Sequence, residues 1–131
     1  MAPSTHFDPV FRRLREILAK HDGSLDVSDD TPVRYCLESK IGPATLQAWG
    51  GKTKRARIPV AWVEAGKGYV SYHLMGVANP AVQSAMSNDL KARMQGKTCF
   101  NFTSLDEAAI NELDTVTSSS IAAFKKAGFI A

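Results

Sequence analysis

The sequence has few of the residues that build metal or redox centres. It contains two cysteines and three histidines in 131 residues. Cys36 and Cys99 match no zinc or thioredoxin-type spacing, so we expect two reduced, unpaired thiols inside apolar strands. His6, His21 and His73 are scattered along the chain and do not suggest one shared metal site. These shortages argue against a zinc finger, a disulfide scaffold and a dithiol redox enzyme.

A large excess of charge and a long apolar run are also missing. The 16 basic and 13 acidic side chains leave a net charge of +3, which is too small to predict nucleic-acid binding from charge alone. No apolar stretch is long enough for a membrane span, and the N-terminus has no apolar signal segment. We therefore expect a cytoplasmic protein without a membrane partner, and we do not expect nucleic acid as its partner.

What is present is the composition of an ordinary globular domain. Apolar residues make up 44% of the chain and charged residues 22%. The length predicts one domain over residues 1–131, because one core of this size can be stable without staples. Residues 1–5 carry no apolar pattern and are expected to fray.

Three helices are predicted from apolar residues at helical spacing and from capping signals. They begin at Asp8 with Pro9, at Asn79 with Pro80, and at Ser104, which can form a capping box with Glu107. They end at Gly23, Gly96 and Gly128.

Strands are predicted mainly in the middle of the chain, where β-branched and aromatic residues gather. The predicted strands are Val33–Ser39, Leu46–Trp49, Ile58–Glu64, Tyr69–Met75 and Thr98–Thr103. The third and fourth read as a hairpin, because a glycine-bearing loop joins them. Trp62, on the third, is expected to pack in the core.

The fold class that follows is α+β. Strands joined by tight turns favour an antiparallel sheet, and the helices are expected to pack on one face of it. The predicted order of elements is α-β(3-4)-α-β-α.

A polar row is predicted on one face of the hairpin. Tyr69, Ser71 and His73 alternate along one strand, and Glu64 on the partner strand could reach them. Such a row could bind a ligand or supply a general base. A half-buried sheet face with satisfied side chains is the other interpretation, and it is the commoner outcome.

A basic run follows Trp49. Lys52, Lys54, Arg55 and Arg57 lie on a turn between predicted strands, without an acidic neighbour. The run could bind phosphate, nucleic acid or an acidic partner. The alternative, which we favour, is a solvated turn that protects a strand edge.

An acidic cluster lies after the first predicted helix. Asp26, Asp29 and Asp30 could share a hard cation, since such ions take several oxygen ligands. Their order does not match a calcium-binding loop, and aspartates are also common turn residues. We favour the interpretation that these aspartates are turn-forming residues of a loop.

Three segments together resemble the YdhG-like family of small domains. They are the hairpin Ile58–Gly76, the segment Gly96–Phe102 (GKTCFNF) and the helix from Asp106 to Phe124. The resemblance covers roughly residues 34–127. It implies a frataxin-like α/β sandwich, and iron chaperones are known among relatives of that family.

Three functions stay open at this stage. The first is a non-enzymatic module that binds a protein or small ligand through the sheet face. The second is frataxin-like iron handling, which the resemblance raises. Against it, the first helix carries Arg12, Arg13 and Arg15 where an acidic ridge would be needed. The third is a small enzyme that uses the polar row.

Overall fold

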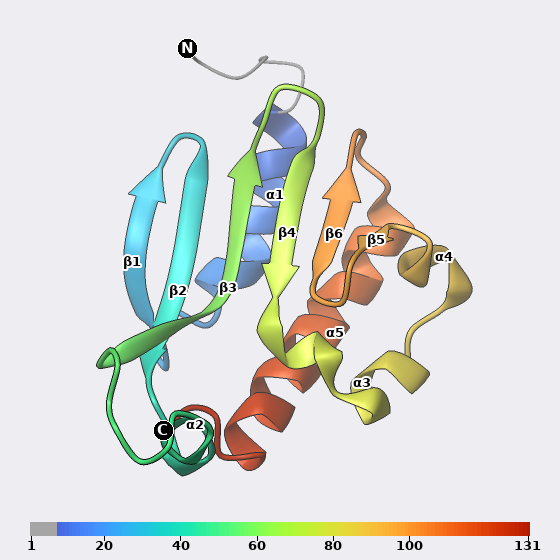
Figure 1. Cartoon of the computed structure of the whole chain (residues 1–131). Helices are drawn as coiled ribbons and strands as arrows, with labels where there is room; N and C mark the ends of the chain where they lie inside the picture. Colours follow the sequence, from blue (N-terminus) through green and yellow to red (C-terminus); the bar gives the residue numbers. More distant parts are fainter. Residues whose placement is uncertain (1–7) are drawn as a thin grey trace.

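From residue 8 onward the chain folds into a six-stranded antiparallel sheet and five helices (Figure 1). The computed structural model describes residues 8–131, so the predicted fraying of residues 1–5 lies outside the described part. The helices are α1 (Asp8–Ala19), α2 (Pro43–Ala48), α3 (Pro80–Ser84), α4 (Asn88–Lys91) and α5 (Glu107–Lys126), with a short 3-10 turn, η2 (Met75–Ala78). The strands are β1 (Asp26–Thr31), β2 (Arg34–Lys40), β3 (Arg57–Ala65), β4 (Val70–Leu74), β5 (Met94–Gln95) and β6 (Cys99–Phe102).

The strand order is β1-β2-β3-β4-β6-β5, and every neighbouring pair is antiparallel. The predicted β3–β4 hairpin lies at the centre of this sheet, with Trp62 opposite His73 and Glu64 opposite Ser71. Pro59 lies near the start of β3, before the pairing with β4 begins at Ala61, so its missing donor interrupts no bond to that neighbour.

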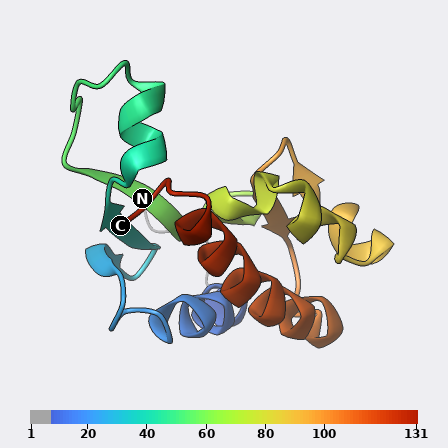
Figure 2. The ribbon, with the colours of Figure 1, turned by 90° about the horizontal axis from the view of Figure 1, so that it is seen from below.

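The long helices α1 and α5 lie side by side on one face of the sheet (Figures 1 and 2). Alternate residues of the central strands point toward them, which is the two-residue period of a sheet with one covered face. In β4 the burial alternates strictly, with Val70, Tyr72 and Leu74 fully buried and the residues between them half-buried. The fully buried core side chains include Leu14, Ile17 and Leu18 of α1, Val60 and Val63 of β3, Phe100 and Phe102 of β6, and Ile110 and Leu113 of α5.

Two close contacts tie the centre of the sheet to α5. The Tyr72 hydroxyl and the Thr117 hydroxyl are 2.6 Å apart, and Thr117 also donates to the Leu113 carbonyl at 2.7 Å. Next to this pair, Gly76 lies so close to α5 that an added Cβ would stand 2.2 Å from the Ser120 carbonyl oxygen. The helix therefore approaches the end of β4 at backbone distance, which only glycine permits.

The expectation of a strand over Leu46–Trp49 was wrong, because residues 43–48 form the helix α2. Pro43 occupies the first helical turn, where its fixed φ suits a helix and its missing donor costs nothing. Two consecutive glycines then end the element, with positive φ of 72° at Gly50 and 82° at Gly51. Pro43 indicates a helix start in the sequence, whereas the short apolar run Leu46–Trp49 favoured a strand.

The expectation that the acidic cluster lies in a loop was also wrong, because residues 26–31 form the edge strand β1. Its side chains are mostly exposed, and the register shifts by a bulge between Val27 and Asp29. Charged residues and a bulge are common on edge strands, where they discourage pairing with another chain. The backbone pairing with β2 therefore outweighs the poor strand propensity of aspartate.

The helix predicted from Asn79 to Gly96 is broken into α3 and α4. The side chain of Ser87 caps α4 by accepting from the Leu90 amide at 3.1 Å. The Ser87 hydroxyl in turn donates to the Glu112 carboxylate of α5 at 2.6 Å. The short strand β5, which was not predicted, follows α4.

The predicted capping box at Ser104 is also corrected. Helix α5 begins at Glu107, and the Asp106 carboxylate caps it by accepting from the Ala109 amide at 3.2 Å. Within residues 8–131 no helix is both long and apolar enough to cross a bilayer.

Candidate functional site

The face of the sheet opposite α1 and α5 is left without a helix over it in the described part of the chain (Figures 1 and 2). We call this face the open face. It presents the outward residues of the four central strands, most of them half-buried. They are Arg34, Cys36 and Glu38 of β2, Trp62 and Glu64 of β3, Ser71 and His73 of β4, and Cys99 and Asn101 of β6.

At the middle of the open face, Trp62 stacks on His73. The two rings come from directly opposed positions of β3 and β4, with centroids 4.5 Å apart and planes inclined by 9°. Trp62 is thus half-buried on the open face, and the expectation that it packs in the core was wrong. Its indole has a flat partner here in the imidazole, so cross-strand stacking replaces burial between the layers.

A thiol lies on the far side of His73. Cys99 of β6 is opposite His73, with 3.7 Å between its Sγ and the histidine Nε2 and 3.5 Å between Sγ and the Asn101 Oδ1. Burial lowers the pKa of His73, although the nearby Glu64 carboxylate opposes this. Burial also raises the pKa of Cys99. Both shifts favour the uncharged pair, a thiol beside a neutral imidazole.

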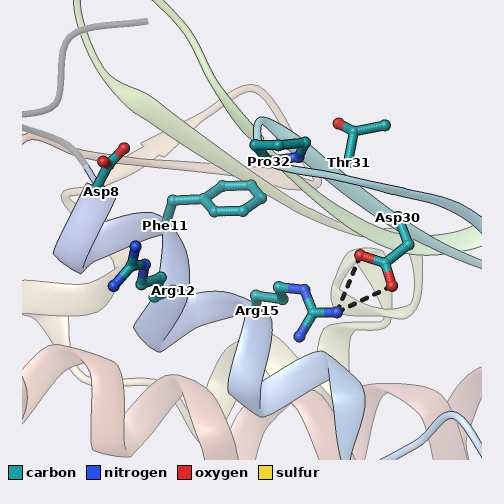
Figure 3. A pocket seen from close by; sticks show the side chains of 7 residues that line it. All are labelled: Asp8, Phe11, Arg12, Arg15, Asp30, Thr31 and Pro32. Carbon is teal, nitrogen blue, oxygen red and sulfur yellow. Dashed lines mark hydrogen bonds and ion pairs between the residues drawn. The ribbon is translucent and has the colours of Figure 1, made fainter.

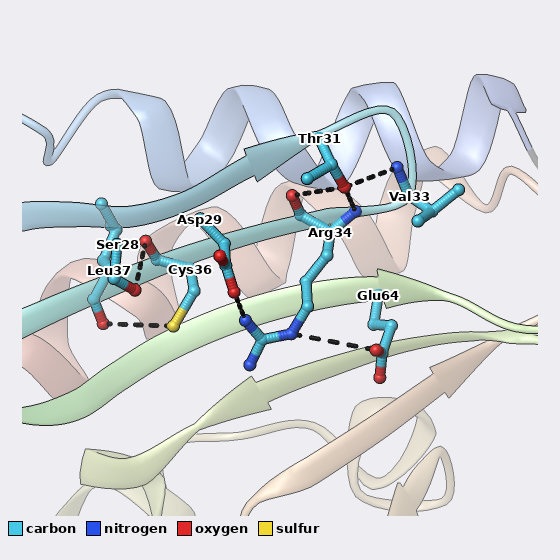
Figure 4. Close-up of polar contacts among 8 residues, drawn as sticks. All are labelled: Ser28, Asp29, Thr31, Val33, Arg34, Cys36, Leu37 and Glu64. Carbon is cyan, nitrogen blue, oxygen red and sulfur yellow. Dashed lines mark hydrogen bonds and ion pairs between the residues drawn. The ribbon is translucent and has the colours of Figure 1, made fainter.

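An ion-pair network borders one side of this centre (Figure 4). The Arg34 guanidinium donates to the Asp29 carboxylate and lies 3.8 Å from a Glu64 oxygen. Thr31 holds the adjoining turn by accepting from the Arg34 amide at 3.0 Å. The network therefore carries both signs of charge, and the same cross-strand row continues with the neutral side chains of Ser71 and Asn101.

The predicted polar row is in part brought together. Ser71, His73 and Glu64 share the open face, and the Ser71 hydroxyl donates to the Glu64 backbone carbonyl at 3.4 Å. Tyr69 precedes β4 and is 47% exposed, at the edge of the row. Trp62, Cys99 and Asn101 were missed, because only the strand register shows which of their faces is open.

The three aspartates proposed as a metal site are not brought together. Asp29 pairs with Arg34, Asp26 with Arg57 at 2.7 Å, and Asp30 with Arg15 at 2.9 Å. Asp30 is opposite the core residue Tyr35, on the other face of β1 from Asp29. Among residues 8–131 no group of three histidine, cysteine, aspartate or glutamate side chains could hold a metal ion.

The basic run is placed on an exposed loop between α2 and β3. Lys52, Lys54 and Arg55 are exposed, and Arg57 begins β3 and pairs with Asp26. The loop lies beside α2, at the end of the molecule where β3 begins (Figure 1).

A cleft of about 460 Å³ lies between α1 and the β1–β2 turn (Figure 3). Phe11 and Pro32 form its apolar part, and Arg15 closes one side through two bonds to Asp30 of 2.9 and 3.0 Å. Arg15 also lies over the Tyr35 ring at 4.6 Å, so its charge is already engaged. Asp8 and Arg12 also line the cleft and are in no ion pair among residues 8–131, so the cleft keeps one charge of each sign.

Comparisons of this chain with protein-family models, with curated proteins and with solved structures found no match. The function has to be argued from the surface itself.

Proposed function

We propose that this chain is a non-enzymatic binding module and that its open face is where a protein partner docks. The observation that carries the proposal is the stacked pair of Trp62 and His73, half-buried at the centre of a sheet face over which no helix of residues 8–131 lies. Aromatic side chains at the centre of a patch with a polar surround supply most of the binding energy in protein interfaces.

The shape of the face favours a protein over a small ligand. Small-molecule sites are concave, and clefts of about 310–460 Å³ do occur on this chain, but their linings contain none of the open-face residues. The mixed charges of Arg34, Asp29 and Glu64 at one border fit a partner surface that also carries both signs.

Catalysis is the second candidate, because a thiol and an imidazole lie 3.7 Å apart beside Asn101. A cysteine nucleophile acts as the thiolate, however, and burial shifts the pKa values of Cys99 and His73 toward the neutral pair. The same two shifts favour a face that can be covered by a partner without burying a charge.

Site-specific photo-crosslinking tests the proposal. A crosslinking residue at Ser71, on the open face, is expected to trap one discrete protein in cells. The same residue at Ser118, exposed on α5, is the matched control and is expected to trap none of it. Trp62→Ala should abolish the crosslink at Ser71, whereas Trp62→Phe should retain part of it, and circular dichroism checks that both variants fold.

Two results count against the proposal. Equal crosslinking from Ser71 and Ser118 would mean that the open face has no preferred partner. A small molecule that native mass spectrometry finds on the wild type and not on Trp62→Ala would mean that the face takes a ligand and not a protein.

A further inference from the structure

Positive charge is segregated into two segments of the chain. Residues 39–63 and 115–131 contain none of the 13 carboxylate side chains and seven of the 16 cations. The other nine cations are outnumbered by those 13 carboxylates, so the rest of the chain has a net charge of −4. The net charge of +3 for the whole chain hides this separation.

The fold joins these two segments at one end of the molecule. The Gly42 amide donates to the Phe129 carbonyl at 2.9 Å, and the Ala131 amide donates to the Lys40 carbonyl at 3.0 Å. The contact is tight, because a Cβ on Gly42 would stand 2.2 Å from the Gly128 carbonyl oxygen. Figure 2 looks onto this end, where the chain after α5 runs back to the start of α2 and the loop after α2 projects on the other side of that helix.

We call this surface the basic end. Its members are all exposed: Lys40 at the end of β2, Lys52, Lys54 and Arg55 on the loop, Arg57 at the start of β3, and Lys125 and Lys126 in the last turn of α5. Of these seven cations, only Arg57 is in an ion pair with a carboxylate among residues 8–131. Of the nine cations elsewhere, Arg13, Arg15, Lys20, Arg34 and Arg93 are paired with carboxylates, whereas Arg12, Lys67, Lys91 and Lys97 are in no ion pair among residues 8–131. Six of the seven cations at the basic end therefore have no carboxylate partner in the described part of the chain, and an anionic partner would neutralise their charge.

Aromatic side chains lie among these cations. Phe129 is 39% exposed, and its carbonyl accepts from the Thr45 hydroxyl at 2.6 Å. Trp49 follows α2, is half-buried, and lies one helical turn after Thr45, whose carbonyl accepts from its amide at 3.1 Å. Cations that contact phosphates and aromatic rings that stack on bases are the two components of surfaces that bind single-stranded nucleic acid.

We propose that the basic end binds single-stranded nucleic acid without sequence preference, through backbone phosphates and stacking on Trp49. This site is separate from the open-face centre, since Arg57 and Trp62 lie five residues apart on β3, roughly 16 Å at the rise of a strand. The four cations of the basic run predict little by themselves. Only the fold shows that the segment carrying the α5 lysines contacts the segment that carries this run.

Fluorescence anisotropy with a labelled oligothymidylate of 20 nucleotides tests the proposal at 50 and 200 mM salt. Binding is expected to weaken steeply with salt, with a slope of about −0.7 for each phosphate contact. Lys52→Gln/Lys54→Gln/Arg55→Gln should weaken binding and reduce the slope by about 2. Lys125→Gln/Lys126→Gln should reduce it by about 1.4, although these lysines lie outside the basic run.

The matched control is Lys67→Gln/Lys91→Gln/Lys97→Gln. It removes three exposed cations that are in no ion pair among residues 8–131, so it makes the same change in net charge. The control is expected to bind nearly as the wild type. If it weakens binding as much as the loop variant does, the effect is net charge alone and the proposal is overturned.

Stacking separates nucleic acid from an acidic protein. In a Trp62→Phe background the oligonucleotide should quench the fluorescence of Trp49, and Trp49→Ala should weaken binding about tenfold. If Trp49→Ala has no effect and poly-glutamate binds as tightly as the oligonucleotide, the basic end is a site for acidic proteins and the proposal fails. No binding of the oligonucleotide at 50 mM salt would overturn it as well.

Discussion

At the scale of single residues, burial decides the chemistry of the open face. Cys36 and Cys99 are both unpaired, and both have their pKa raised by burial. Cys36 is 2% exposed, whereas Cys99 is half-buried beside His73. The two thiols should therefore differ more in their exposure to reagents than in the direction of their pKa shift.

Cys99 is expected to react slowly with iodoacetamide at pH 7, because only the thiolate is the nucleophile and burial keeps Cys99 protonated. The rate should keep rising with pH above the pH range in which a free thiol ionises. Cys36→Ser and Cys99→Ser assign the two rates by mass spectrometry, and Cys36 should react only on unfolding. Fast stoichiometric labelling of native Cys99 at pH 7 would contradict this and would favour a catalytic thiol.

His73 is expected to make stability depend on pH. Its pKa is lowered in the folded protein by burial, from an ordinary value of 6.5. Below that value the unfolded chain takes up a proton that the folded chain resists, so the free energy of unfolding should fall as pH drops below about 6.5. The loss should stop once the pH passes the folded pKa.

Urea unfolding at several pH values between 5 and 8 measures this effect. His73→Gln keeps a polar side chain and should flatten the dependence, while His21→Gln serves as the control histidine variant. A wild-type profile that His73→Gln leaves unchanged would show that other groups cause the dependence.

At the scale of elements, the joint between the end of β2 and the end of α5 holds the basic end together. Gly42→Ala is expected to destabilise the protein by about 1–3 kcal/mol, as overpacking does, because the new methyl would overlap the Gly128 carbonyl. Gly23→Ala is the matched control, since nothing lies within 4 Å of its added methyl. Urea unfolding that shows equal stabilities for the two variants would mean that the joint yields easily.

Strand β1 bears on the iron hypothesis. Because Asp26, Asp29 and Asp30 each contact a different arginine, a cation would have to displace those pairs to gather them. We expect iron to bind no tighter than about tens of micromolar, at the level of generic carboxylates. Anaerobic calorimetry measures this, with Asp26→Asn/Asp29→Asn/Asp30→Asn as the comparison. A tight stoichiometric site that this variant abolishes would favour iron handling.

At the scale of the whole molecule, one core joins the sheet to α1 and α5. Leu14→Ala should cost about 2–5 kcal/mol, because Leu14 is fully buried and its loss leaves a cavity. Glu16→Ala, exposed on the same helix, is the control and should change stability by less than about 0.5 kcal/mol.

Tryptophan fluorescence and circular dichroism should report one coincident transition for both Leu14→Ala and Glu16→Ala, since Trp62 lies on the same sheet. Two separate transitions would mean that α1 unfolds independently of the sheet.

The sequence by itself determined the elements whose signals are local and strong. The apolar stripe of α1, the β3–β4 hairpin and the alternation of Ser71 and His73 with Val70, Tyr72 and Leu74 follow from periods of 3.6 and 2 residues, and the structure confirms them. The α+β class and the antiparallel sheet follow from the order of those elements.

Only the tertiary structure decided what depends on contacts distant in sequence. The aspartates of β1 lie in a strand because β2 pairs with them, and Trp62 stacks on the open face because His73 stands opposite. Cys99 and Asn101 join that centre through the register of β6. The basic end likewise exists because hydrogen bonds bring residues 40–45 against residues 128–131. Local pattern carries the period of an element, whereas sites are made by pairing between elements, which no local pattern encodes.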